Sequence, residues 1–152
     1  MKKSISLILP NIRSCHNVGS IFRTADAFGV DKIYLCGYTP APPDPRIDKV
    51  ALGAEKTTAF EKQEDTASLI KNLQKKGVSV VAAELTDDSI DYANWKPDFP
   101  LAIVFGHEVD GVPEDILNLV DQKIHIPMLG SKESLNVSVA AGVILARLRM
   151  NK

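Results

Sequence analysis

The stretch that decides the fold reads LAIVFGHEVDGVP and covers residues 101–113. Its first five residues are all apolar, which is typical of a strand buried in the middle of a sheet. Polar residues follow at once, and Gly106 and Gly111 flank them. Glycine lets a ligand approach the backbone closely, so this turn suits a binding loop. We therefore expect a buried strand with a binding loop at its carboxyl end.

Other apolar runs alternate with helical patterns along the rest of the chain. Strands are predicted over residues 4–9, 32–35, 78–83 and 123–126, and helices over residues 18–28, 66–76, 114–120 and 137–150. Gly29 and Gly77 stand where the first two helices should end. Four prolines in the segment 38–46 predict a loop there. The alternation predicts an α/β protein, with a mostly parallel sheet and helices on both faces.

Length and composition limit the class of protein further. A chain of 152 residues favours a single domain over residues 1–152. No apolar run reaches the roughly 20 residues that cross a bilayer, so no membrane partner is expected. Cys15 and Cys36 lack metal-ligand spacing, and without an export signal they are expected to be free thiols in the cytoplasm. The three histidines, at positions 16, 107 and 125, also lack ligand spacing, so no metal is expected.

The charge is nearly balanced but unevenly distributed. A net charge of −1 argues against a protein that simply coats nucleic acid. Residues 1–56 nevertheless hold eight Lys or Arg against five Asp or Glu. Charge alone leaves two readings open, a local basic face on this part of the chain and an ordinary mixed surface.

The ends of the predicted strands indicate where a ligand should bind. Ligands of open α/β sheets gather beyond the carboxyl ends of the strands. Three predicted strands end in unusual loops at residues 84–86, 106–108 and 127–130. The chain has no Gly-x-Gly-x-x-Gly and no Gly-x-x-x-x-Gly-Lys, which disfavours a dinucleotide or P-loop site. We expect a site of another kind where the three loops meet.

Polar residues in three blocks each admit a structural and a functional interpretation. Asn17 precedes a predicted helix and could cap it, and Arg23 could be a surface cation or could hold a phosphate or an oxyanion. Glu108 could lie in a plain turn or could bind a cationic or hydroxyl-bearing ligand. Ser134 or Asn136 could cap the last helix, but capping explains only one of the polar residues in that block.

Taken together, the three blocks resemble the motifs of the SpoU, or TrmH-like, family of the SPOUT class of RNA methyltransferases. The most specific parts are NVGSIFRT at 17–24, FGHEVDGV at 105–112, IPM at 126–128 and SLNVSVA at 134–140. Their order and spacing match the family, and the resemblance runs from about Ser4 to Arg147. The sequence LGAE at 52–55 also resembles a stretch of the family's ribose methyltransferases.

The resemblance implies a fold, a reaction and partners. The segment from about 84 to 145 would form a deep trefoil knot, a rare feature among folds. The knot would bind S-adenosylmethionine, and a homodimer would complete each site. The implied reaction is methylation of a ribose 2′-hydroxyl in RNA, with S-adenosylhomocysteine as product. The compactness of the chain slightly favours tRNA over rRNA as substrate. We expect no separate RNA-binding extension, so the core dimer or another protein would recognise the RNA.

The resemblance also assigns the site residues. The catalytic positions would be Arg23 at the hydroxyl, Asn17 to place Arg23 or the substrate, and Glu108 and Asn136 as the remaining polar groups. The cofactor would lie against Leu85, Gly106, Ile126, Met128, Ser134 and Leu135. No metal is implied, because the sulfonium is already an activated leaving group.

Arg23 poses a chemical difficulty, because an arginine is normally a poor proton acceptor. It could become neutral in a dry site and act as a base. It could instead stay charged and stabilise the developing alkoxide, while a phosphate or water accepts the proton. We favour the charged form. Two rival functions stay open: a catalytically silent RNA-binding protein on the same fold, and a nucleotide-binding α/β enzyme that does not act on RNA.

Overall fold

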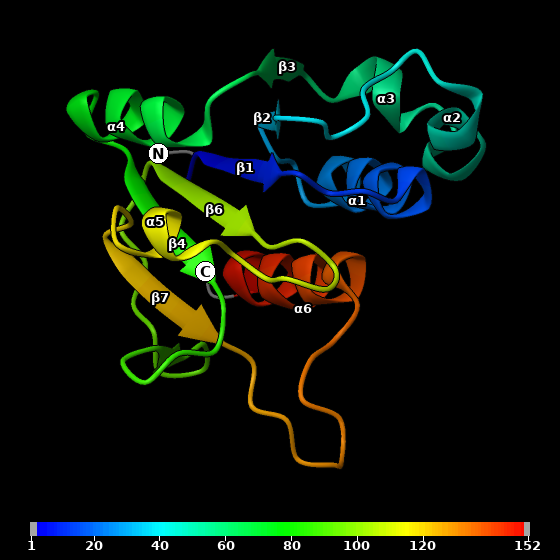
Figure 1. Ribbon diagram of the computed structural model, residues 1–152. Helices are drawn as coiled ribbons and strands as arrows, with labels where there is room; N and C mark the ends of the chain where they lie inside the picture. The colour runs from blue at the N-terminus through cyan, green and yellow to red at the C-terminus, as the bar shows by residue number, and fades with distance from the viewer. Residues whose placement is uncertain (1–2, 151–152) are drawn as a thin grey trace.

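The computed structural model describes residues 3–150, and its centre is one seven-stranded sheet (Figure 1). The strands are β1 (Ile5–Pro10), β2 (Lys32–Cys36), β3 (Phe60–Gln63), β4 (Ser79–Ala83), β5 (Ile90–Asp91), β6 (Leu101–Phe105) and β7 (Gln122–His125). They lie in the order β3-β2-β1-β6-β4-β7-β5, and every neighbouring pair is parallel. The predicted parallel α/β sheet is confirmed.

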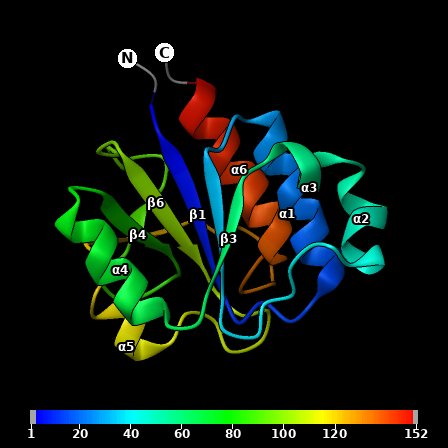
Figure 2. The ribbon, with the colours of Figure 1, turned by 90° about the horizontal axis from the view of Figure 1, so that it is seen from above.

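Helices cover both faces of the sheet, as predicted (Figure 2). They are α1 (Cys15–Ala27), α2 (Pro45–Ala51), α3 (Ala54–Thr57), α4 (Thr66–Lys75), α5 (Glu114–Leu117) and α6 (Val137–Met150). Apolar side chains of α1, α2, α3 and α6 form one core with the sheet, and those of α4 and α5 form the other. Every residue of β6 is buried, because cores on both faces enclose this central strand.

The first helix begins earlier than its pattern suggests. Ser14 is its N-cap, and the Ser14 hydroxyl accepts a hydrogen bond from the backbone N–H of Asn17 at 3.1 Å. The expectation that Asn17 caps this helix is therefore wrong. Ser14 has the extended backbone that a cap requires, and Asn17 lies inside the first turn with its amide free for other partners.

Four elements, α2, α3, β3 and β5, were not predicted. The helix α3 has four residues, too few for a pattern, and the other three also have local reasons. The proline-rich loop ends in α2, where Pro45 begins the helix and the Asp44 carboxylate caps it at the backbone N–H of Arg46. The edge strand β3 has only one apolar residue, Phe60, because an edge strand need not be buried on both faces. The strand β5 has two residues, too few for any pattern.

Gly19 has a packing role in this arrangement. A Cβ at this position would lie 2.6 Å from the backbone oxygen of Ile47 and 2.9 Å from the Cβ of Val50. Only glycine therefore lets α1 approach α2 this closely. Within residues 3–150, no helix combines the length and the apolar content that a membrane span requires.

Candidate ligand pocket and polar network

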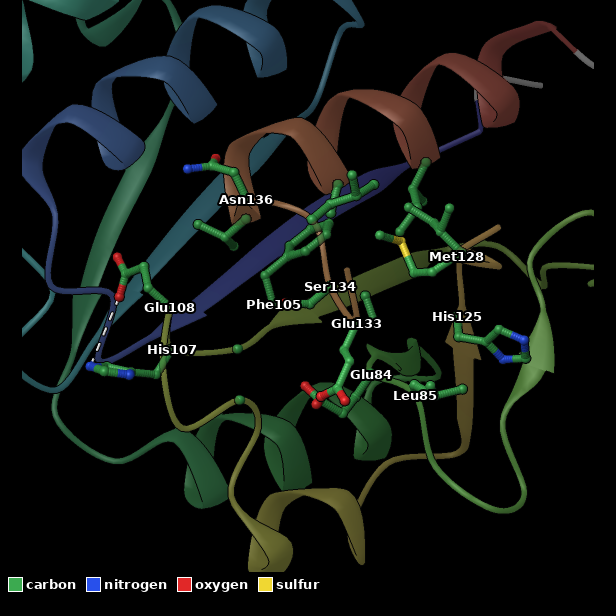
Figure 3. Close-up of a pocket in the computed structure, with 18 of the residues that line it drawn as sticks. Glu84, Leu85, Phe105, His107, Glu108, His125, Met128, Glu133, Ser134 and Asn136 are labelled. Atoms are coloured by element: carbon green, nitrogen blue, oxygen red, sulfur yellow. Dashed lines mark ion pairs between the residues drawn. The ribbon is translucent and has the colours of Figure 1, made fainter. Parts of the chain in front are cut away.

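A cavity of about 410 Å³ opens at the carboxyl ends of β4, β6 and β7, where the strand-end loops were expected to meet (Figure 3). This volume lies within the range of small-molecule sites, roughly 300–1,000 Å³. The six residues expected to hold a cofactor all line it: Leu85, Gly106, Ile126, Met128, Ser134 and Leu135. Four of the six belong to the loop between β7 and α6, which projects from the body of the molecule in Figure 1.

The turn after β6 is shaped by its two glycines. A Cβ at Gly106 would lie 2.5 Å from the carbonyl carbon of Gly111 and 2.6 Å from the backbone nitrogen of Val112. Gly111 has a positive φ of 70°, which favours glycine. Two backbone hydrogen bonds between His107 and Gly111, of 3.2 and 3.0 Å, close the turn. The glycines therefore let the segment fold back on itself beside the cavity.

His107 locks the tip of this turn. Its Nδ1 accepts hydrogen bonds from the backbone N–H groups of Val109 and Asp110, at 3.0 and 3.1 Å. An accepting Nδ1 carries no proton, so the neutral ring carries its proton on Nε2. This Nε2 lies 3.9 Å from Oε2 of Glu108, as the dashed line in Figure 3 shows.

Glu108 ties this turn to the start of α1. Its Oε1 accepts from the backbone N–H of Ser14 at 3.1 Å and from the side-chain amide of Asn17 at 3.3 Å. Its Oε2 accepts from the backbone N–H of Arg13 at 3.2 Å. Burial acts to raise the pKa of Glu108, but these donors and its own backbone N–H together hold that pKa below its ordinary value. Glu108 is thus an ionised carboxylate at neutral pH.

Asn17 and Asn136 extend the same chain of hydrogen bonds to the last helix. The Asn136 amide donates to Oδ1 of Asn17 at 3.2 Å. Oδ1 of Asn136 accepts from the backbone N–H of Ser138 at 2.8 Å, so Asn136 also caps α6. Asn17 is only 6% exposed. Three of the four expected catalytic residues, Glu108, Asn17 and Asn136, therefore meet in one network at the edge of the pocket.

Arg23 is not part of this network. Its side chain is exposed, does not line the pocket, and has no hydrogen bond or ion pair within residues 3–150. Arg23 lies six residues beyond Asn17 on α1, which is about 9 Å along the axis and differs by about one third of a turn in direction. Within residues 3–150, Arg23 therefore stands apart from the network that holds Asn17.

Two carboxylates in the pocket, Glu84 and Glu133, were not among the expected site residues. Figure 3 shows both side chains directed into the same part of the cavity. Oε2 of Glu84 accepts from the backbone N–H of Val112 at 3.1 Å. Burial raises the pKa of Glu84 more than this hydrogen bond lowers it. The only sequence signal was the position of Glu84 directly after an apolar strand, in a loop that was expected to reach the site.

The pocket is acidic as a whole. Four acidic residues line it, Glu84, Glu108, Asp110 and Glu133, and no Lys or Arg among residues 3–150 does. Such a lining favours a ligand that carries positive charge. The fold and the pocket together define a parallel α/β protein that binds a small ligand at the carboxyl edge of its sheet.

Comparison with known proteins identifies the family. Residues 4–146 match the model of the SpoU rRNA Methylase family, and the chain belongs to this family. A tRNA (guanosine(18)-2′-O)-methyltransferase from Thermus thermophilus is 36% identical over 93% of this chain and 72% of its own length. A tRNA (guanosine(18)-2′-O)-methyltransferase from Aquifex aeolicus is 33% identical, over 95% of this chain and 68% of its own length.

A solved structure shares the fold. The S-adenosylmethionine-bound rRNA methyltransferase from Sinorhizobium meliloti superposes with a TM-score of 0.91 at 28% identity, over 98% of this chain and 57% of that one. The chain thus spans little more than half of that protein's length.

Proposed function

We propose that the protein transfers the methyl group of S-adenosylmethionine to a ribose 2′-hydroxyl of RNA. One observation carries the proposal: the network of Glu108, Asn17 and Asn136 joins three separate sequence motifs at the edge of the pocket. The family membership and the names of the relatives support it. A catalytically silent RNA-binding protein is the second candidate, and the intact set of polar residues counts against it.

The residues of the pocket suit this cofactor. S-adenosylmethionine carries a sulfonium and an ammonium group, and Glu84 and Glu133 offer carboxylates to such charges. The backbone around Leu85, Gly106 and Leu135 would hold the adenosine, with apolar side chains of the β7–α6 loop packed beside it. When bound, the cofactor would supply an activated methyl group on a positively charged sulfur, and S-adenosylhomocysteine would be the product.

Arg23 acts at the ribose hydroxyl from a second copy of the chain. Within residues 3–150 no hydrogen bond or ion pair joins it to the network, and it does not line the pocket, so the site needs an arginine from elsewhere. The outer surface of α6 supports pairing of two copies, because α6 is largely apolar and Val139 on it is 50% exposed. Arg23 stays charged and stabilises the developing alkoxide, and a phosphate of the RNA or a water molecule accepts the proton.

The role of Asn17, Glu108 and Asn136 is to hold other groups in position, and they take no direct part in methyl transfer. Glu108 holds the backbone of Arg13 and Ser14, and Asn136 caps α6 while it holds Asn17. Together they keep the start of α1, the turn after β6 and the start of α6 in one arrangement. These segments form a rigid surface beside the pocket, and a ribose bound on that surface would face the cofactor.

The knot and the substrate complete the proposal. The pocket loops all fall within residues 84–145, the segment that the family resemblance assigns to a trefoil knot, which supports a knotted cofactor site. The tRNA substrates in the names of two relatives support tRNA over rRNA as substrate. A cytoplasmic location follows from a tRNA substrate.

The direct test uses RNA from a strain that lacks the gene. The purified protein is incubated with radiolabelled S-adenosylmethionine and with separate pools of tRNA and rRNA. We expect label in tRNA, and a single 2′-O-methylated nucleoside after digestion. Binding of S-adenosylhomocysteine, measured by calorimetry, is expected in either case. Binding of the cofactor without label in any RNA would support the silent RNA-binding protein instead.

A further inference from the structure

A second, open hollow adjoins the cofactor pocket, and the proposed chemistry makes no use of it. The hollow is lined by Arg13, Tyr38, His107, Val109 and Asp110. His107, Val109 and Asp110 also line the cofactor pocket. The two spaces are therefore separated only by the turn at 107–110, so an occupant of the hollow lies beside the cofactor.

Tyr38 presents an aromatic ring to this hollow from a fixed backbone. Its side chain is 58% exposed, and it makes no ring contact within residues 3–150. The backbone N–H of Tyr38 donates to Oδ1 of Asn11 at 3.0 Å. The buried hydroxyl of Thr39 donates to the carbonyl of Leu9 at 2.7 Å and accepts from the backbone N–H of Ile12 at 2.9 Å. The segment with Tyr38 is thus fastened to the segment that leads to Arg13.

Arg13 adds a cation beside this ring. Its side chain is exposed and has no hydrogen bond or ion pair in the described part of the chain. Its backbone N–H is held by Glu108 at 3.2 Å, so its main chain is fixed by the polar network. An unpaired guanidinium on a fixed backbone suits a phosphate group, which it binds with two parallel hydrogen bonds.

The far wall of the hollow offers a hydrogen-bond acceptor. His107 belongs to this wall, but its side chain is only 14% exposed and its Nε2 lies 3.9 Å from Oε2 of Glu108. Asp110 is a carboxylate acceptor whose side chain is 83% exposed. An aromatic ring, an acceptor and a cation around one open hollow match a nucleobase and its phosphate.

We propose that this hollow, the base subsite, binds a nucleobase of the RNA substrate stacked on Tyr38, with the adjoining phosphate at Arg13. The inference rests on the proposed function, because an RNA ribose at the cofactor pocket carries its own base and phosphates to within one nucleotide of that pocket. A protein partner is a poorer match, since the hollow holds one aromatic ring and polar groups rather than an apolar surface.

The test compares Tyr38→Ala with Tyr38→Phe, using total tRNA from a strain that lacks the gene. Filter binding measures RNA affinity, and the labelled-methyl assay measures kcat/KM. We expect Tyr38→Ala to weaken both by about tenfold, because stacking on the ring is lost. Tyr38→Phe keeps the ring and stays close to wild type. Binding of S-adenosylhomocysteine stays unchanged in both variants.

Arg13→Ala provides an independent measure, with Lys71→Ala as its control. Lys71 is an exposed cation on α4, away from the hollow. Arg13→Ala should lower RNA affinity and reduce the slope of log affinity against log salt by roughly one, while Lys71→Ala changes neither. Thermal unfolding of every variant checks that the fold is kept.

The outcomes separate this inference from the proposed function. If tRNA is methylated equally well by wild type and Tyr38→Ala, the base subsite is overturned and the function stands. If no RNA is methylated but RNA binding still depends on Tyr38, the function fails and the base subsite stands. If the wild-type protein binds no RNA, both are overturned.

Discussion

Asn17 of the polar network and Arg23 lie on the same helix, α1, and belong to the same sequence motif, yet their surroundings are opposite. Asn17 is buried, and its amide is bonded on one side to Glu108 and on the other to Asn136. Arg23 is exposed and has no partner within residues 3–150. One motif therefore serves two purposes. Asn17 helps to hold three segments of the chain together, and Arg23 presents a charged group on the surface.

The largest effect is expected from Arg23. Arg23→Ala should lower kcat for RNA methylation by about 100-fold to 1,000-fold, because a preorganised charge at the developing alkoxide is lost. Arg23→Lys should also be strongly impaired, since a point charge does not replace the planar fork. Single-turnover methylation measures both variants. Near-full activity of Arg23→Lys would show that charge alone suffices.

A substitution in the polar network is expected to have a smaller effect, on the stability of the fold and not on the methylation step. Asn17→Ala leaves the Asn136 amide without its acceptor and takes one donor from Glu108. We expect the free energy of unfolding to fall by about 1–3 kcal/mol, because two hydrogen bonds worth roughly 0.5–1.5 kcal/mol each are lost. Urea denaturation measures it, and Arg23→Ala is the matched control, expected to change stability by less than about 0.5 kcal/mol. Equal destabilisation by the two substitutions would contradict the comparison.

The smallest effects on stability are expected from the carboxylates of Glu108 and Glu84, and these two effects have opposite signs. The folded state holds the pKa of Glu108 below 4.5 and that of Glu84 above 4.5. The stability from Glu108 is therefore complete above about pH 4.5 and is lost as the pH falls through its lower folded pKa. Glu84 has the opposite effect on stability. Folding disfavours its ionised form, so Glu84 lowers the stability of the folded state once the pH rises above about 4.5.

Two substitutions measure this difference. At pH 7 without ligand, Glu108→Gln should lower the melting temperature and Glu84→Gln should raise it slightly. Below pH 4 both differences should shrink, because the wild-type groups become protonated. Melting curves between pH 3 and pH 7 follow the trend. A melting temperature that moves in the same direction for both variants would show that their environments do not differ as described.

Most strands and helices could be predicted from the sequence, because the signals for them are local. The apolar run at β6 and the pattern of α6 lie within single elements, and both elements have the predicted bounds. The strand β3 and the helix α2 were missed, since an edge strand needs little apolar surface and a proline-rich segment conceals a short helix. The cap of α1 was misplaced because Ser14 and Asn17 are both good cap residues and only backbone geometry separates them.

The candidate site, too, could be predicted from the sequence only in part. The six residues expected at the cofactor do line the pocket, and most of them belong to motifs that are continuous stretches of sequence. The network could not be predicted, because its hydrogen bonds join residues that are 91 and 119 positions apart. Glu84 was overlooked for a similar reason: the turn that buries it lies 28 positions further along the chain.

The central claim is that Arg23 of one copy completes the pocket of another, and a mixing experiment tests it most directly. Arg23→Ala and Glu108→Ala are each purified, and the two proteins are mixed under conditions that exchange subunits. In a mixed dimer, one site then combines an intact Arg23 with an intact Glu108. The account predicts that the mixture methylates RNA faster than either variant alone and approaches about a quarter of wild type, because half of the dimers are mixed and each regains one of its two sites. No recovery on mixing, with subunit exchange confirmed by mass spectrometry, would contradict it.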